Sequence, residues 1–233
     1  MYNKKTFLAI IPARGGSKRL PRKNTLDLAG KPLIAWTIES GLKSKYIDEV
    51  MVTTDDEEII EISEKYGAIL PFKRPDILAN DTATRPEVIK HTINFYKKNL
   101  KKEFDYIVYL QPTSPLRTEI DIDGAIEYMF KKKSDAVVSV CELEHPVHWT
   151  GTLPKNKNMS KFLSDVAIKS RSQDLETNYR LNGAIYICNT VKFLDQGCMF
   201  LKENIFAYVM NQNISIDIDT EVDFNYVLSI LQK

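Results

Sequence analysis

The 233-residue sequence predicts an α/β fold with a doubly wound, mostly parallel sheet. Short apolar runs alternate along the chain with segments whose apolar residues recur at helical spacing, which is typical of consecutive strand–helix–strand units. The first apolar run, residues 7–11, contains no polar residue, as expected of a parallel strand buried on both faces. These observations favour one open sheet with helices on both sides.

Local signals place the individual elements. Pro32 and Pro86 stand where helices can begin, because proline is tolerated in the first helical turn. A helix lies between Thr54 and Asp55, which can cap its start, and Gly67, which ends it. The other predicted helices are residues 32–42, 86–100, 120–132 and 221–231. The predicted strands are residues 7–11, 49–54, 68–72, 106–110, 136–140, 184–188, 205–210 and 214–218.

The alternation of strand and helix breaks after Cys141. Residues 142–178 are polar and irregular, with Pro146, Pro154 and a run rich in lysine and asparagine. We interpret this stretch as an insertion or arm on a single domain of residues 1–233, and not as a linker between two domains.

Composition excludes several classes of function. Lys plus Arg number 32 and Asp plus Glu number 31, so the net charge gives no reason to expect nucleic acid or an anionic membrane as partner. No signal peptide and no apolar run long enough to span a bilayer is found. Three cysteines without metal-ligand spacing indicate a reduced, cytoplasmic protein.

The strongest motif is the loop of residues 12–24, which directly follows the first predicted strand. Ligands of open α/β sheets bind at the carboxyl ends of strands. Gly15 and Gly16 let the backbone turn tightly and direct N–H groups at an anion. The loop lacks both the GxxxxGK[ST] spacing of P-loops and the GxGxxG spacing of dinucleotide sites. Its five cations suit a nucleoside triphosphate: Arg14, Lys18, Arg19, Arg22 and Lys23.

A pair of acids near the C-terminus is the second candidate site. In a strand of period two, Asp217 and Asp219 share one face, roughly 6.5–7 Å apart. Two carboxylates at this spacing can hold Mg²⁺ against a triphosphate. Alternatively, Asp219 or Thr220 caps the last helix, with Asp223 in its first turn.

These motifs together resemble the acylneuraminate cytidylyltransferases, the family that synthesises CMP-sialic, CMP-legionaminic and CMP-pseudaminic acids. The pattern IIPARGGSK…P.KN at residues 10–24 carries the resemblance most specifically. The resemblance extends from residue 10 to about residue 224, and it implies a Rossmann-like nucleotidyltransferase fold. Supporting matches lie at residues 52–56, 74–82, 110–117, 180–186 and 216–220.

The resemblance implies a role for each matched residue. CTP is bound by Arg14, Ser17, Lys18, Lys23, Asn24, Arg74, Ala83 and Thr84, the last three at the cytosine and ribose. The sugar acid, a nonulosonic acid, is contacted by Gln111 and Asn182, with Arg171 or Arg180 at its carboxylate. Mg²⁺ is held by Asp217 and Asp219. The catalytic residues are Arg14, Lys23 and Asp219.

The resemblance also implies a homodimer in which residues 142–178 reach the partner's active site. The expected activity is transfer of CMP from CTP to a nine-carbon 2-keto sugar acid, with release of pyrophosphate, for surface glycan synthesis. The nearest alternative is CMP-Kdo synthetase, because residues 19–21, Arg-Leu-Pro, fit that family. A metal-dependent glycosyltransferase using Asp217 and Asp219 is a second alternative, and a non-catalytic nucleotide-binding subunit is a third.

Overall fold

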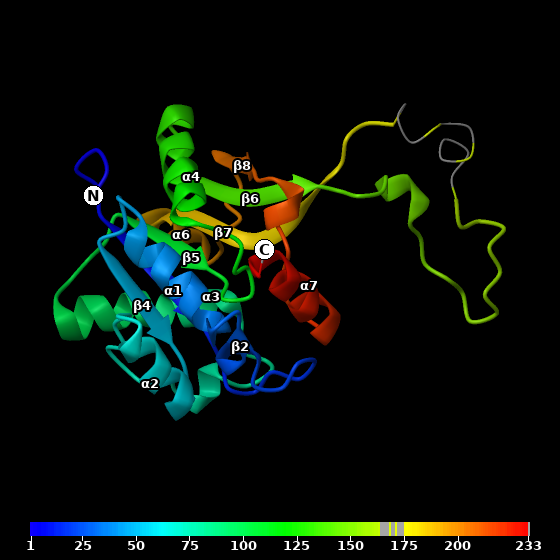
Figure 1. Ribbon diagram of the computed structural model, residues 1–233. Coiled ribbons are helices and arrows are strands. Elements are labelled where there is room, and N and C mark those ends of the chain that lie inside the picture. Colours follow the sequence, from blue (N-terminus) through cyan, green and yellow to red (C-terminus); the bar gives the residue numbers. More distant parts are fainter. Residues whose placement is uncertain (164–167, 169–170, 172–174, 233) are drawn as a thin grey trace.

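The computed structural model describes residues 1–163, 168, 171 and 175–232. Its centre is a six-stranded sheet in the order β4-β1-β5-β7-β6-β8 (Figure 1). Every strand runs in the same direction except β7, which is antiparallel to both of its neighbours. The strands are β1 (Phe7–Pro12), β4 (Glu49–Thr53), β5 (Tyr106–Leu110), β6 (Ala136–Glu142), β7 (Tyr179–Asn189) and β8 (Ile205–Val209). The prediction of a mostly parallel sheet is therefore confirmed.

Helices cover both faces of the sheet, as doubly wound topology requires. Side chains alternate along β1. Phe7, Ala9 and Ile11 pack on one face of the sheet, in a core cluster that includes residues of α1 (Leu33–Lys43) and α4 (Glu119–Lys132). Leu8 and Ile10 pack on the other face, in a cluster that includes residues of α3 (Arg85–Phe95). The helices are α1 (Leu33–Lys43), α2 (Glu57–Lys65), α3 (Arg85–Phe95), α4 (Glu119–Lys132), α6 (Thr190–Gln196) and α7 (Glu221–Leu231). Smaller elements include a β2–β3 ribbon (Asp27–Leu28 with Lys31–Pro32) and a π-helical turn at Tyr96–Leu100, directly after α3.

Two predicted strands are wrong. Residues 68–72 contribute only one bridge, Met51 to Ile69, and Pro71 has no N–H with which to extend it. Residues 214–218 follow a 3-10 turn, Gln212–Ile214, and then run irregularly. The side-chain hydroxyl of Ser215 donates to the Asn211 carbonyl at 2.8 Å, so local hydrogen bonding replaces a ladder there.

Helix caps match the predicted positions closely, with one correction. Asp56 caps α2, not Thr54 or Asp55, and its carboxylate accepts from the Ile59 N–H at 3.1 Å. Gly67 follows the helix in the left-handed region, with φ +89°, as predicted. Helix α6 was not predicted, because its seven residues are too few to show helical spacing.

Residues 143–163 and 175–178, between β6 and β7, leave the body of the molecule as a long excursion, drawn at the right of Figure 1. Its regular structure includes a short 3-10 turn, Val147–Trp149. This excursion coincides with the predicted arm at 142–178. Its part in dimerisation, and the division of the chain into one domain with an arm, stay predictions.

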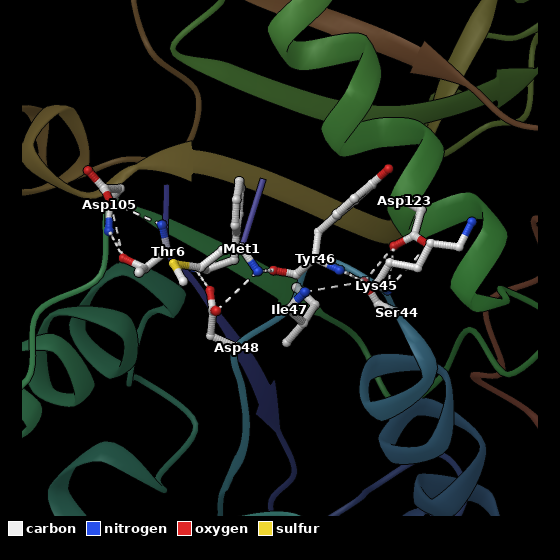
Figure 2. Close-up of polar contacts among 10 residues, drawn as sticks. Met1, Thr6, Ser44, Lys45, Tyr46, Ile47, Asp48, Asp105 and Asp123 are labelled. Atoms are coloured by element: carbon white, nitrogen blue, oxygen red, sulfur yellow. Dashed lines mark hydrogen bonds and ion pairs between the residues drawn. The ribbon is translucent and has the colours of Figure 1, made fainter. Parts of the chain in front are cut away.

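Three aspartates fix the loops around the amino ends of β1, β4 and β5 (Figure 2). Asp48 accepts from the Phe7 N–H at 2.7 Å, and Asp105 accepts from the Thr6 N–H at 3.0 Å. Asp123 of α4 accepts from the Ser44 hydroxyl at 2.6 Å. These contacts occupy the amino ends of the strands, and the candidate site lies at the opposite, carboxyl ends. None of the described helices combines the length and the apolarity needed to cross a bilayer.

Candidate active site

A cleft of about 570 Å³ opens at the carboxyl edge of the parallel strands. Its walls come from the loop after β1, the segment that leads into α3, the turn after β5 and the segment before α7. Four regions distant in sequence therefore meet where this fold class binds ligands. Predicted site residues that line the cleft are Arg14, Ser17, Lys18, Lys23, Asn24, Arg74, Ala83, Thr84, Gln111 and Asp219.

Lys23 joins the basic loop to the C-terminal segment. It begins a 3-10 turn after Arg22, whose backbone is left-handed with φ 55°. Its side chain is only 9% exposed, and its ammonium donates to the Ile218 carbonyl at 2.5 Å and to Asp219 Oδ1 at 3.1 Å. The same cation is thus positioned both for a phosphate in the cleft and for the predicted metal-binding acid.

The glycine pair has one position that requires glycine. A Cβ on Gly15 would lie 2.5 Å from Asp56 Oδ2, closer than two such atoms can approach. The Gly15 N–H donates to Asp55 Oδ1 at 3.3 Å, so the loop is held against the start of α2. Gly16 has open space around it and is not required sterically.

Surface acids pair with the loop cations at the mouth of the cleft. Asp81 accepts from Arg14 at 3.0 Å and from Lys18 at 2.5 Å. Arg19 contacts Asp219 at 2.6 Å. These side chains are at least 38% exposed, so the pairs are weak and an incoming phosphate can displace the carboxylates. Arg22 differs from the other cations, because it pairs with Asp56 and Glu58 and does not line the cleft.

Asp217 is a largely buried carboxyl group beside the cleft. Its Oδ1 is buried without a hydrogen-bond partner. Burial raises the pKa of Asp217, and the nearby Asp219 carboxylate raises it further. The segment is anchored by the Ile218 N–H, which donates to the Thr113 carbonyl at 2.8 Å. The unpartnered oxygen of Asp217 and the nearby Asp219 carboxylate together favour a cation between the two acids.

Gly183 lets Asp217 and Gln111 lie side by side. Its φ is +77°, and a Cβ there would lie 2.6 Å from Gln111 Oε1 and 3.5 Å from Asp217 Oδ2. A Cβ at this position would displace the Gln111 amide, whereas it would only touch Asp217. The predicted sugar-acid contact and the predicted metal ligand are therefore neighbours, although 106 positions of sequence separate them.

The two acids fit a magnesium ion. Magnesium prefers hard oxygen ligands and keeps water or phosphate oxygens in most of its six positions. The unpartnered oxygen of Asp217 and the exposed carboxylate of Asp219 supply two ligands. Within the described residues, no group of three or more His, Cys, Asp or Glu side chains could hold a metal by itself. A substrate triphosphate would have to complete the coordination.

Three predicted sugar-acid residues do not line the cleft. Asn182 is 1% exposed, and its amide is used by Ser139 and Ser215, so it ties β7 to its neighbours. Arg180, also on β7, donates to the Ser215 carbonyl at 3.2 Å. Arg171 is exposed and belongs to the excursion outside the cleft. Direct sugar contact by these residues within one chain is therefore not what the geometry shows.

Sequence reasoning assigned no site role to several residues of the cleft, among them Asp81, Arg85 and Tyr109. Asp81 and Arg85 flank the predicted nucleotide contacts Ala83 and Thr84, so their position along the chain was the available signal. Tyr109 was counted only as part of a strand, because an aromatic residue inside an apolar run gives no sign of lining a site.

The cytidylyltransferase family profile matches residues 8–222, almost the whole chain. The chain belongs to this family. It is therefore a nucleotidyltransferase, and the cleft lined by the basic loop and by Asp219 is its active-site candidate. The predicted family and enzyme class are confirmed.

Curated relatives cover the same span of the cytidylyltransferase. Pseudaminic acid cytidylyltransferase of Campylobacter jejuni is 38% identical over 97% of this chain and 96% of its own length. CMP-N,N'-diacetyllegionaminic acid synthase of Legionella pneumophila is 39% identical over 94% and 93%. N-acylneuraminate cytidylyltransferase of Escherichia coli is 39% identical over 97% of this chain, which spans 52% of that longer protein.

Solved structures support the nucleotidyltransferase fold. CMP:2-keto-3-deoxy-manno-octonic acid synthetase in complex with CTP superposes with a TM-score of 0.71, at 20% identity, over 97% of this chain and 98% of that one. The 4-diphosphocytidyl-2C-methyl-D-erythritol synthase of Anaerococcus prevotii gives 0.67 at 18% identity, over 98% and 97%. At such identities the likeness concerns the fold alone.

Proposed function

We propose that this cytidylyltransferase transfers CMP from CTP to a nine-carbon 2-keto sugar acid and releases pyrophosphate. One observation carries the proposal: Lys23 contacts Asp219 inside a cleft that also holds Arg14, Ser17 and Gln111. The cleft thus combines cations suited to a triphosphate with carboxylates suited to a magnesium ion.

In the proposed reaction, the anomeric hydroxyl oxygen of the sugar acid bonds to the α-phosphorus of CTP. The bond between that phosphorus and the bridging oxygen to the β-phosphorus breaks, and pyrophosphate leaves as the hydroxyl proton is released. Such a transfer asks the protein for positioning and charge stabilisation. Arg14 and Lys23 hold the phosphates, and Gln111 orients the sugar acid beside them.

Asp217 and Asp219 are the proposed magnesium ligands. When bound, Mg²⁺ would neutralise charge on the triphosphate and favour departure of pyrophosphate. Phosphate binding would draw Lys23 and Arg19 away from Asp219, since both cations contact that carboxylate.

The class of sugar acid is proposed from the relatives. Three relatives named for pseudaminic, legionaminic and N-acylneuraminic acids are 38%, 39% and 39% identical to the chain, so overall identity favours none of them. The Kdo-specific alternative has weaker support, because that likeness is structural at 20% identity.

Assembly and location complete the proposal. The excursion between β6 and β7 exposes apolar side chains, including Trp149, Leu153 and Met159, which suits contact with a second copy of the chain. We therefore propose a homodimer that works in the cytoplasm, consistent with three free cysteines. Sedimentation equilibrium at micromolar concentration would give twice the 26.8 kDa chain mass if this is right.

The decisive experiment measures pyrophosphate release from CTP and Mg²⁺ with four acids: N-acetylneuraminic, N,N'-diacetyllegionaminic, pseudaminic and Kdo. We expect release with at least one nine-carbon acid, and no release without an acid. Release with Kdo alone would support transfer of CMP to a sugar acid but contradict the proposed class of acceptor, a nine-carbon acid. Folded protein that binds CTP but stays silent across the panel would contradict the proposed transfer to these acids.

A further inference from the structure

Asp56, the residue that caps α2, also contacts the loop after β1. Its carboxylate accepts from both terminal nitrogens of Arg22, from Nη1 at 2.5 Å and from Nη2 at 3.1 Å. A pair with two such bonds fixes both the position and the orientation of the guanidinium. The same carboxylate accepts from the Ile59 N–H at 3.1 Å, so it is itself fixed to the helix. Asp56 is therefore a rigid anchor for the Arg22 side chain.

The start of α2 contacts the loop at a second point, Gly15. The Gly15 N–H donates to Asp55 Oδ1 at 3.3 Å, and a Cβ on Gly15 would lie 2.5 Å from Asp56 Oδ2. The loop backbone thus packs directly against the two acids. Lys18, which lines the cleft, lies between Gly15 and Arg22 along the chain. This part of the loop is therefore held at both ends by the start of one helix.

Arg22 passes this restraint to the next residue, Lys23. Its backbone is left-handed, with φ 55°, a region that residues with a side chain seldom adopt. Its carbonyl accepts from the Thr25 N–H at 2.9 Å, which closes the 3-10 turn that Lys23 begins. Arg22 does not line the cleft, whereas Lys23 does. Any contribution of Arg22 to ligand binding therefore acts through the conformation of the loop.

We infer that Asp56 is a positioning residue, which holds the loop of residues 12–24 through Arg22 in the conformation that binds the triphosphate. The inference rests on the proposed function, because it assumes that this loop binds CTP. A loop that is already held in its bound conformation loses less freedom on binding, and the affinity for the ligand is higher as a result. The acids of the motif at residues 52–56 thereby acquire a role in the nucleotide site, beyond capping α2.

The charge of Asp56 separates positioning from a direct electrostatic effect. CTP is strongly anionic, so a nearby carboxylate weakens its binding through space, and loss of that carboxylate should strengthen binding. If Asp56 positions the loop, its loss should weaken binding instead. Asparagine caps helices about as well as aspartate does. Asp56→Asn therefore removes the charged partner of Arg22 and retains the cap of α2.

The test is calorimetric titration with CTP, without sugar acid and at constant Mg²⁺ and salt. The proteins are wild type, Asp56→Asn, Arg22→Gln, the double variant and Arg22→Lys. Glu57→Gln is the matched control, because Glu57 lies in the same helical turn and pairs with Lys73, which follows α2. Thermal unfolding verifies that each variant is folded.

Asp56→Asn and Arg22→Gln should each raise the Kd for CTP about threefold to tenfold, the range expected for coupled residues in contact. The double variant should bind no more weakly than the weaker single variant, because the pair acts as one unit. Arg22→Lys should fall between wild type and Arg22→Gln, since an ammonium lacks the planar fork. Glu57→Gln should bind CTP at least as tightly as wild type.

Amide hydrogen exchange gives a readout that does not depend on ligand. Exchange in residues 14–24 should be faster in Asp56→Asn and Arg22→Gln than in wild type or Glu57→Gln. Tighter or unchanged CTP binding by Asp56→Asn would overturn the inference. Losses of affinity that add in the double variant, or loop exchange equal to that of wild type, would overturn it as well.

The same titrations separate the two proposals. If wild type binds CTP more tightly than both single variants, yet transfers CMP to no sugar acid, the positioning role stands and the proposed function is contradicted. If wild type forms the CMP-sugar, and both single variants bind CTP as tightly as it does, the positioning role alone is contradicted. Wild type that does not bind CTP would contradict both.

Discussion

Two arginine-bearing loops follow the adjacent strands β1 and β5 and use their cations in opposite ways. Arg14, after β1, is 38% exposed and pairs with the surface acid Asp81 at 3.0 Å. Arg117, after β5, is 1% exposed, and burial lowers its pKa to about 9. It donates to the Gln111 carbonyl at 3.2 Å and to the Ala184 carbonyl at 3.0 Å.

The difference lies in the partners. A carboxylate at the surface can be exchanged for a phosphate, because water solvates it once it is released. Buried carbonyls cannot be exchanged, because they would be left without a donor. The β1 loop is thus adapted to bind a ligand, and the β5 turn is adapted to hold Gln111 in place.

The largest effect is expected from Lys23→Ala. It removes the cation that contacts both the phosphates and Asp219, so turnover should fall by about 10²–10³-fold, as for loss of one preorganised charge-stabilising group. Steady-state pyrophosphate release measures it, with Lys65→Ala on the exposed face of α2 as control. Near-normal turnover by folded Lys23→Ala would exclude this role.

Arg117→Leu should be the most damaging change to stability. It removes donors from the buried Ala184 carbonyl, the partly buried Gln111 carbonyl and the buried hydroxyls of Thr37 and Ser40. We expect a loss of about 3 kcal/mol or more in the free energy of unfolding. Urea titration followed by circular dichroism measures it. A loss under about 0.5 kcal/mol, the range of ordinary surface changes, would contradict the holding role.

Asp217→Asn should make the protein more stable at pH 7, although it removes a proposed magnesium ligand. Burial raises the pKa of Asp217, so its charged form opposes folding. The stability contributed by this carboxyl group is present below the unfolded pKa of about 3.9 and is lost as pH rises through the higher folded value. The variant should therefore unfold at a higher temperature than wild type at pH 7, and the gain should shrink toward pH 4.

Mg²⁺ gives the same variant a second readout. With CTP present, Mg²⁺ should raise the unfolding temperature of wild type but not of Asp217→Asn. Asp195→Asn, on an exposed position of α6, serves as control. If Mg²⁺ stabilised wild type and Asp217→Asn equally, Asp217 would not be a ligand of the metal ion.

The smallest effect is expected from Asp81→Asn. The variant lacks the carboxylate that competes with phosphate for Arg14 and Lys18, so the KM for CTP should fall about two- to fivefold, in keeping with weak surface pairs. The decrease should diminish as salt is added. A higher KM would mean that Asp81 assists CTP binding rather than competing with it.

Local sequence rules predicted most of the fold because many elements carry strong local signals. The apolar run of β1 and the capped segment of α7 were placed within one residue. Residues 214–218 were misjudged, because their alternating pattern resembles a strand and the hydrogen bond of Ser215 that prevents one is invisible in sequence.

The residues of the candidate site that lie on one continuous loop could be predicted from the sequence. The residues that come together only through tertiary packing could not. Nine residues of the nucleotide and sugar sets line the cleft, together with the predicted metal ligand Asp219. Asn182 lies outside the cleft and bonds to Ser139 and Ser215, because a polar residue within a motif can also serve as a buried tie between strands. Arg85 was not assigned to the site, because its place in the cleft depends on packing against Tyr186, about 100 positions away.

The central claim is that this cleft joins CMP to a sugar acid. Phosphorus NMR of the wild-type protein with CTP, Mg²⁺ and the accepted nine-carbon acid tests it most directly, because each product has its own resonance. We predict one new phosphodiester signal and one pyrophosphate signal that grow as CTP declines, with twice the intensity in the pyrophosphate signal, because that product contains two equivalent phosphorus atoms. Free CMP with pyrophosphate and no sugar phosphodiester, or unchanged CTP with all four acids, would contradict the claim.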